Sequence, residues 1–123
     1  MGILPKKDEE MKRLESSIQQ EIVIFFKNNY CLKHHVPRCE IFSVPNEGRS
    51  KLETIHKKAT GMLAGVSDLI ILLPNRVVFV EVKTDVGRQS EHQIRFEQTV
   101  KALGLEYYLV RKLEDFKQIK INL

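Results

Sequence analysis

Long apolar segments are missing from this chain of 123 residues. No run approaches the roughly 18 apolar residues that a membrane-spanning helix requires. The opening residues, MGILPKKDEE, have neither the apolar core nor the cleavage site of a secretory signal, and Lys6 stands where an N-myristoylation motif has Ser or Thr. We therefore expect a cytoplasmic protein without a membrane partner.

Internal repeats and low-complexity tracts are also absent, and so is a strong charge of either sign. With 42% hydrophobic residues, the chain can form one compact core, which predicts a single domain over residues 1–123. Its 20 Lys and Arg against 16 Asp and Glu give a net charge of +4. This balance suits a nucleic-acid partner and many other proteins, so the charge alone does not identify a partner.

Cysteine is scarce, with one pair that brackets two histidines in the segment CLKHHVPRC. Cys31, His34, His35 and Cys39 could be taken for a zinc cluster. Structural zinc sites use two separated ligand pairs, such as C-x2-C and H-x3-H, and this spacing does not match them. The favoured interpretation is two reduced cysteines in a basic loop, and the sequence assigns the cluster no role.

Hydrophobic periodicity and turn residues predict a mixed α/β domain in which a mixed sheet is flanked by helices. Helices are expected at residues 8–30, 51–63, 90–103 and 113–119, and strands at 39–44, 68–73, 77–83 and 106–111. The two central strands are almost continuously apolar, which favours a sheet covered on both faces. Ser90 to Gln93 fits a capping box, and Gly104 should end that helix.

Two polar residues are predicted to point inward from helices. On a helical wheel, Glu15 lies within the apolar stripe of the first helix, whereas Glu21 lies at its edge. Gln93 shares a face with the inward stripe of the third helix, which is formed by Phe96, Val100 and Leu103. Glu15 and Gln93 are therefore candidate site residues.

Three charged residues lie at or within the central apolar strands of GVSDLIILLPNRVVFVEVK. Glu81 and Lys83 share a face because alternate side chains of a strand point the same way. Burying unpaired charges in such strands costs several kcal/mol. Their presence, together with Asp68 at the start of the neighbouring strand, requires an explanation.

The hairpin register decides whether Asp68 joins the other two charges. If residues 73–76 form a four-residue loop, Leu72 lies opposite Val77 and Asp68 lies opposite Glu81. A shift of one residue would turn Asp68 to the other face of the sheet. We predict the first register, which gathers all three charges on one face.

Opposed carboxylates repel each other, and a divalent cation between them reverses this effect. Mg²⁺ accepts oxygen ligands from one or two carboxylates, which fits Asp68 and Glu81, with the Val82 carbonyl as a further ligand. Lys83 would hold a water or neutralise charge on a phosphate. The alternative is a surface ion pair of Glu81 with Lys83 beside a helix-capping Asp68, since the same E-x-K pattern occurs in the charge-rich segment 10–12.

These residues resemble the PD-(D/E)xK nuclease signature and, more specifically, the virus-type replication-repair nuclease domain, VRR-NUC, over residues 15–111. The matching segments are ESSIQ (15–19), PNEGR (45–49), KATGMLAG (58–65), GVSD (65–68), EVK (81–83) and GRQSEHQ (87–93). Ser67 stands where the signature has proline, which is not a ligand. The resemblance implies a restriction-endonuclease-like core and Mg²⁺- or Mn²⁺-dependent hydrolysis of DNA that leaves 5′-phosphates.

The resemblance also implies roles for individual residues. Asp68 and Glu81 would hold metal, and Glu15 would reach the metal through water or directly. Lys83 would serve catalysis, and Gln93 would border the site. Residues expected to contact nucleic acid are Asn46, Arg49, Lys58, Arg88 and Ser90, and the charges of Lys51 and Arg95 could add phosphate contacts. For Ser90, helix capping is favoured over nucleophilic catalysis.

Small stand-alone members of this family resemble phage and bacterial proteins related to Holliday-junction resolvases. The resemblance therefore implies a homodimer that cleaves branched DNA in a bacterial or phage-infected cell, although the sequence has no dimer signature. The alternative is a non-catalytic DNA-binding or assembly module, against which the intact Asp68, Glu81 and Lys83 argue. A sequence-specific restriction enzyme would need recognition loops for which 123 residues leave little room.

Overall fold

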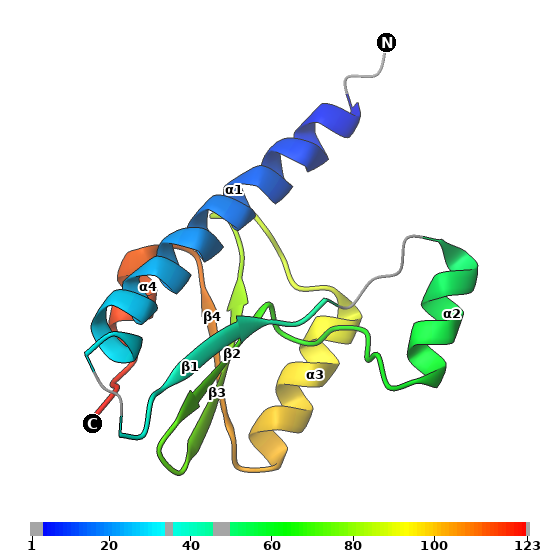
Figure 1. The fold of residues 1–123 in the computed structure, drawn as a ribbon. Coiled ribbons are helices and arrows are strands. Elements are labelled where there is room, and N and C mark those ends of the chain that lie inside the picture. The colour runs from blue at the N-terminus through cyan, green and yellow to red at the C-terminus, as the bar shows by residue number, and fades with distance from the viewer. Residues whose placement is uncertain (1–3, 34–35, 46–49, 123) are drawn as a thin grey trace.

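Helices on both faces of a four-stranded mixed sheet make up the fold of this chain in a computed structural model (Figure 1). The structure describes residues 4–33, 36–45 and 50–122. The mixed sheet flanked by helices confirms the predicted fold class. Within the described ranges, no helix combines the length and the apolar character needed to cross a membrane.

Every predicted element is present, with small differences at the ends. In chain order the elements are α1 (Leu4–Phe26), the π-helical turn η1 (Lys27–Cys31), β1 (Glu40–Ser43), α2 (Lys51–Ala59), β2 (Leu69–Leu73), β3 (Arg76–Val82), α3 (Glu91–Ala102), β4 (Glu106–Val110) and α4 (Leu113–Lys117). The capping box of α3 is confirmed, since the Ser90 hydroxyl accepts from the Gln93 N–H and the Gln93 side chain accepts from the Ser90 N–H. Helix α2 ends earlier than expected because Gly61 turns the chain at φ +114°.

The strands lie in the order β1-β2-β3-β4, antiparallel except for the parallel β3–β4 pair. Leu72 lies opposite Val77, which confirms the predicted hairpin register. The predicted four-residue loop is wrong, because residues 73 and 76 also pair and leave only Pro74 and Asn75 in the turn. Proline followed by Asn75 at φ 56° is typical of a tight type II turn.

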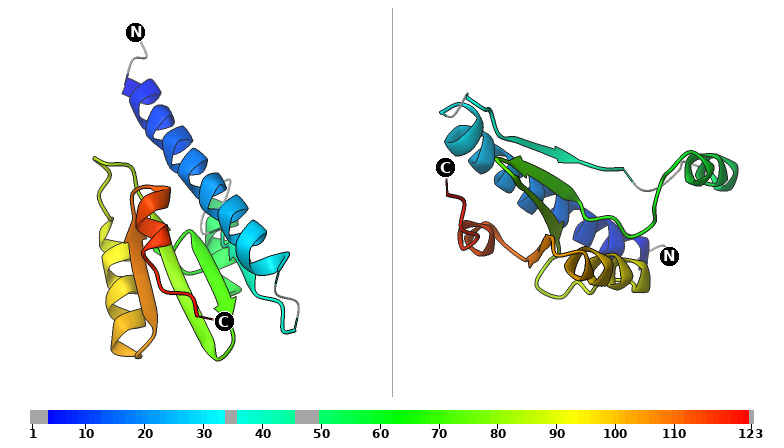
Figure 2. Two further views of the ribbon diagram at one scale, coloured as in Figure 1. Left: turned by 90° about the vertical axis from the view of Figure 1, so that its left-hand side faces the viewer. Right: turned by 90° about the horizontal axis from the view of Figure 1, so that it is seen from below.

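The main hydrophobic core lies between α1, α4 and one face of the sheet (Figure 2). Its sheet side is formed by alternate strand residues, Ile41, Leu69, Ile71, Val78, Val80, Val82 and Val110. Helix α1 contributes Ile22 and Phe26, and α4 contributes Phe116, whose ring lies edge-on to that of Phe26 at 6.5 Å. This packing fixes α1 across the sheet and so determines where Glu15 lies.

The other face of the sheet is only partly covered. Phe96 of α3 packs edge-on against Phe79 at 5.4 Å and Tyr107 at 6.3 Å, so α3 covers β3 and β4. Phe42 and Leu72, on the β1–β2 half of this face, remain 44% and 43% exposed. The predicted coverage of both faces is therefore wrong for that half.

One prediction about the inward stripe of α3 needs correction. Leu103 was expected on the inward stripe of α3, but it is 71% exposed because it caps the helix at its C-terminus, one residue beyond Ala102. Val100 of the same stripe is buried, as predicted. Helix α2 stands to one side of the sheet and buries none of its residues (Figures 1 and 2).

Candidate active site

The carboxylates of Asp68 and Glu81 interlock where β2 begins and β3 ends. The Asp68 N–H donates to Glu81 Oε1 at 3.2 Å, and the Val82 N–H donates to Asp68 Oδ2 at 2.8 Å. The hairpin register thus continues one residue beyond the last β2–β3 pair, as predicted, and places both carboxylates together. Because the N–H and C=O of a strand residue point to the same side, the Val82 carbonyl also lies on the Asp68 side.

Glu81 is the most deeply buried charged residue of this group. It is 1% exposed, and its Oε2 accepts a hydrogen bond from Gln93 Nε2 at 2.7 Å. The Lys83 ammonium lies 3.5 Å from the same oxygen, and the Lys83 residue is only 9% exposed. The surface ion pair considered above is therefore wrong, because this pair lies in the interior.

Burial dominates the electrostatics of the carboxylate pair. Loss of solvent, followed by the nearby Asp68 charge, raises the pKa of Glu81 to about 8, although Lys83 acts in the opposite direction. Burial also raises the pKa of Asp68, against the hydrogen bond from the Val82 N–H, which lowers it. Two carboxyl groups that resist carrying negative charge together provide a setting in which a cation would be stabilised.

Glu15 faces this site from α1. Burial raises the pKa of Glu15, and the charges of Lys83 and Asp68 act on the same carboxyl group. Glu21, the other carboxylate near the apolar stripe, is exposed to solvent. The structure therefore brings Glu15 and Gln93 to the Asp68–Glu81 pair, as the helical periodicity predicted, and leaves Glu21 outside.

The donor set fits a hard divalent cation. Carboxylate oxygens are the ligands that Mg²⁺ and Mn²⁺ prefer, and Mg²⁺ commonly takes one or two carboxylates with water and substrate oxygens completing its shell. Among the residues that the structure describes, no three His, Cys, Asp or Glu side chains converge as a metal cage. The fit therefore rests on Asp68 and Glu81, with Glu15 outside the immediate ligand cluster.

Gly65 positions the loop that precedes Asp68 against α3. It adopts φ +88°, and a Cβ atom there would lie 2.2 Å from the His92 carbonyl oxygen. Only glycine permits this approach. The loop and the first turn of α3, which carries Gln93, are thus in direct backbone contact.

Arg111 holds the turn that follows Lys83. Its Nη1 donates to the carbonyl oxygens of Thr84 at 2.6 Å and Gly87 at 2.8 Å, and more distantly to that of Asp85. This contact and the Gly65 approach were missed by the sequence reasoning. The glycine spacing of KATGMLAG gave a signal for the second, whereas no local pattern indicates which carbonyls a distant arginine binds.

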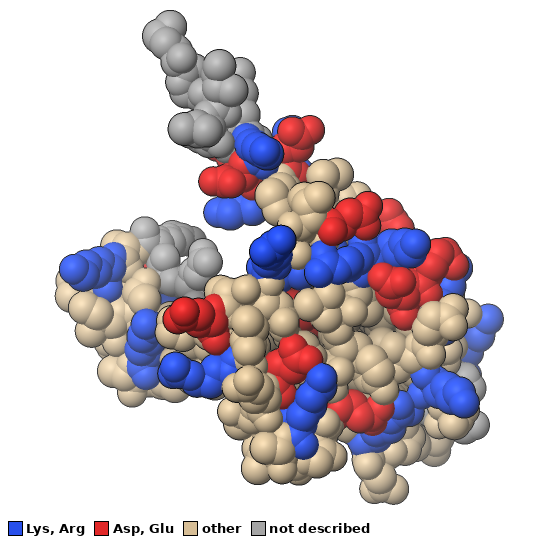
Figure 3. All heavy atoms as spheres, turned by 180° about the vertical axis from the view of Figure 1, so that it is seen from behind, with Lys and Arg blue, Asp and Glu red and all other residues tan. Residues whose placement is uncertain are grey.

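The residues predicted to contact nucleic acid are only partly brought together. Asn46 and Arg49 lie outside the described residues. Lys58 is exposed on α2, Arg88 is exposed before α3, and Ser90 is exposed at the α3 N-cap. On the face opposite that of Figure 1, basic and acidic side chains are interspersed rather than gathered into one basic patch (Figure 3).

The cysteines of the CLKHHVPRC segment lie away from this site. Cys31 and Cys39 are free and buried, and the Cys31 thiol donates to the Cys39 carbonyl oxygen at 3.0 Å. Burial raises the pKa of both thiols, which favours the unreactive protonated form. His34 and His35 lie outside the described residues, and the prediction of two reduced cysteines holds for the described pair.

Comparison with known proteins gives two matches. A family model described as the VRR-NUC domain matches residues 8–112. A solved structure named "VRR_NUC domain" has a similar fold, with a TM-score of 0.55 at 20% identity, over 85% of this chain and 91% of that chain. A search of curated proteins found no match. At this identity the structural likeness concerns the fold.

Proposed function

Because this chain belongs to the VRR-NUC domain family, a family of nuclease domains, we propose that it is a Mg²⁺- or Mn²⁺-dependent endonuclease that hydrolyses phosphodiester bonds of DNA. One observation carries the proposal. Asp68 and Glu81 are interlocked on one face of the sheet, with the ammonium of Lys83 3.5 Å from Glu81. Glu81 and Lys83 are buried and Asp68 is half-buried, an arrangement of charges that is costly for folding and suited to binding metal and phosphate.

The metal would be held by Asp68, Glu81 and the Val82 carbonyl, with Glu15 acting from α1 through water. When bound, a divalent ion supplies positive charge beside the scissile phosphate and promotes ionisation of water. The protein residues arrange the reaction around it. Gln93 fixes the Glu81 carboxylate by donating to Oε2, and Lys83 offers an ammonium group for the charge that develops on the phosphate.

The proposed substrate is branched DNA, held by backbone contacts and cleaved by two copies of the chain. Lys58, Arg88 and Ser90 are exposed on the elements that flank the site and are available for phosphate contacts. Phe42 and Leu72 provide exposed apolar surface on the β1–β2 half of the sheet, where a second copy could pack. Two copies would present two sites to the two strands of a junction.

Cleavage assays with four-way junctions, flaps and plain duplex test this proposal. We expect cleavage with Mg²⁺ or Mn²⁺, no cleavage in EDTA, and a preference for branched DNA. Glu81→Gln and Lys83→Ala should abolish cleavage, with circular dichroism to show that each variant folds. Light scattering of the purified protein measures whether it is a dimer.

The chain supplies its own matched control for these substitutions. Glu10 and Lys12 have the same E-x-K spacing as Glu81 and Lys83 but lie exposed on α1. Glu10→Gln and Lys12→Ala should therefore leave cleavage unchanged. Cleavage that persists in EDTA, or in both the Glu81→Gln and Lys83→Ala variants, would overturn the proposed mechanism in favour of a contaminating nuclease or a different site.

A further inference from the structure

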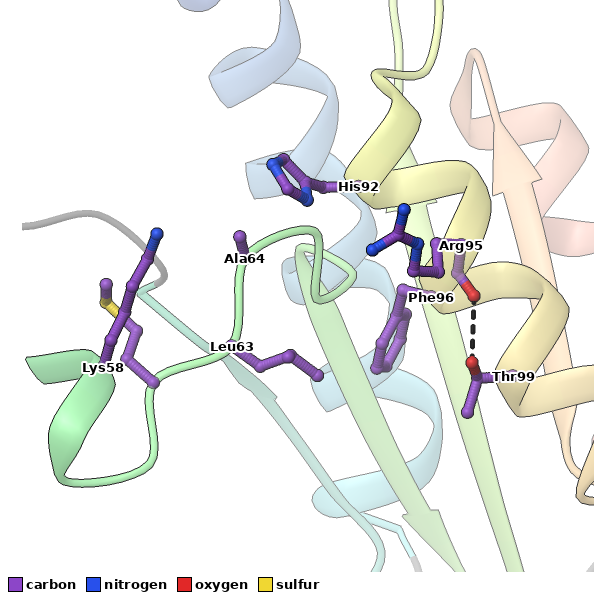
Figure 4. Close-up of a pocket in the computed structure, with 8 residues that line it drawn as sticks. Lys58, Leu63, Ala64, His92, Arg95, Phe96 and Thr99 are labelled. Carbon is purple, nitrogen blue, oxygen red and sulfur yellow. Dashed lines mark hydrogen bonds between the residues drawn. The ribbon is translucent and has the colours of Figure 1, made fainter.

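A cavity of about 380 Å³ lies beside the candidate active site, between α3 and the segment that joins α2 to β2 (Figure 4). This size falls within the range of about 300–1,000 Å³ that is typical of small-molecule sites. Ala64 and His92 line the cavity. These residues are chain neighbours of Gly65 and Gln93, and Gln93 binds Glu81, so the cavity is built from the same loop and the same helix as the candidate active site.

The inner wall of the cavity is apolar and includes an aromatic ring. Phe96 and Leu63 point toward each other within it (Figure 4). The Phe96 ring is fixed from behind by edge contacts with Phe79 and Tyr107, at 5.4 and 6.3 Å. Leu63 is nevertheless 57% exposed. Exposure of this apolar side chain to water is unfavourable in the free protein, and a flat apolar group that fills the cavity would remove it from water.

The rim of the cavity is cationic or neutral. Arg95 and His92 lie on the first turns of α3, and Lys58 lies across from them on α2 (Figure 4). No carboxylate is present among the described residues that line it. An apolar wall with an aromatic ring, bordered by cations, is the combination with which proteins bind single nucleotides, through base stacking and phosphate contacts.

We infer that this cavity binds one unpaired nucleotide of the DNA, with its base between Phe96 and Leu63 and its phosphate near Arg95 and Lys58. The inference rests on the proposed function and adds a specificity element to it. A paired base could not enter, because a duplex keeps its bases stacked and hydrogen-bonded within the helix. The site would therefore favour DNA with an unpaired nucleotide next to the cleaved bond.

Binding without cleavage tests the inference. In EDTA, fluorescence anisotropy compares a duplex that carries one unpaired nucleotide with the same duplex in which that nucleotide is abasic. We expect the base to strengthen binding by about fivefold or more, the lower range for stacking on an aromatic side chain. Phe96→Leu should bring the ratio of these two affinities close to one, and Leu63→Ala should lower the ratio, without changing the affinity for fully paired duplex.

A matched control comes from the same helix. Leu103 is exposed at the C-terminal end of α3, outside the cavity. Leu103→Ala should therefore have the same ratio of affinities for the unpaired-base and abasic DNA as the unaltered protein. Leu63→Ala removes an exposed side chain and provides the test even if Phe96→Leu fails to fold. A ratio near one in the unaltered protein, or an unchanged ratio in Leu63→Ala, would overturn the inference. Because no metal is needed, a protein that binds in this way but does not cleave would overturn only the proposed activity.

Discussion

Gly65→Ala should damage the candidate site more than the same substitution at two other glycines. Gly65, Gly61 and Gly104 all have positive φ, at +88°, +114° and +79°. A left-handed backbone conformation costs a residue with a Cβ about 1–3 kcal/mol, so all three alanine variants should lose stability to this extent. Only at Gly65 would the new Cβ also collide with backbone, 2.2 Å from the His92 carbonyl oxygen, whereas nothing lies within 4 Å at the other two positions.

The size of this collision sets the additional loss of stability and of cleavage rate expected for Gly65→Ala. Restoring an ordinary contact of 3.4 Å or more requires the loop and α3 to separate by over 1 Å. Overpacking of this kind costs about another 1–3 kcal/mol. The shift would also move Gln93 from its 2.7 Å contact with Glu81, and a misplacement of about 1 Å can lower a rate by about 100-fold.

Urea unfolding and the metal-dependent cleavage rate measure the two effects separately. We expect Gly61→Ala and Gly104→Ala to lose stability but retain most of the cleavage rate. Gly65→Ala should lose more stability than either and nearly all of the rate. If Gly65→Ala resembled the two control variants in both measurements, the contact between the loop and α3 would not position the site, and the reasoning would fail.

Three further predictions concern charged and polar groups. In EDTA, the free energy of unfolding should fall as the pH rises from about 5 to about 8. The reason is that Glu81 keeps its proton up to a pKa of about 8 in the folded protein, whereas the unfolded chain releases this proton near pH 4.5. Urea titrations at several pH values measure this dependence, and Glu81→Gln should flatten it. Thr84→Val should raise the free energy of unfolding by about 1 kcal/mol, since the Thr84 hydroxyl is buried without a partner among the described residues, whereas Thr99→Val, at an exposed position, should change it little. Glu15→Gln should slow cleavage by about tenfold or more, and the exposed Glu21→Gln should not, in the same cleavage assay.

The sequence predicted the carboxylate site better than its surroundings, for a physical reason. Alternation in β3 and one hairpin register are enough to bring Asp68 opposite Glu81, and both are local properties of the chain. The register survived an error in the loop because a two-residue turn between residues 73 and 76 keeps the same pairs. Helical periodicity likewise indicated Glu15 and Gln93 without knowledge of what they would face.

Features that depend on tertiary packing could not be predicted in this way. Leu72 is apolar but 43% exposed, because α3 does not extend over the β1–β2 half of the sheet. Strand periodicity is a local pattern and does not indicate how far a helix extends across the sheet. The cavity beside Phe96 exists only because the α2–β2 segment returns to α3, which a one-dimensional pattern does not record. In the sequence, the residues that line this cavity look like ordinary apolar residues and solvated cations, and nothing indicates that they lie together.

Arg111 has a consequence for when the protein can act. The side chains proposed for catalysis all lie between residues 15 and 93, so a ribosome makes them before it makes Arg111. Yet the turn after Lys83 has its carbonyl groups bound by that later arginine, at the end of a strand that pairs in parallel with β3. We therefore expect a growing chain to carry every proposed catalytic group and still lack an ordered site. Any nuclease activity should therefore appear only after synthesis has passed β4 and Arg111.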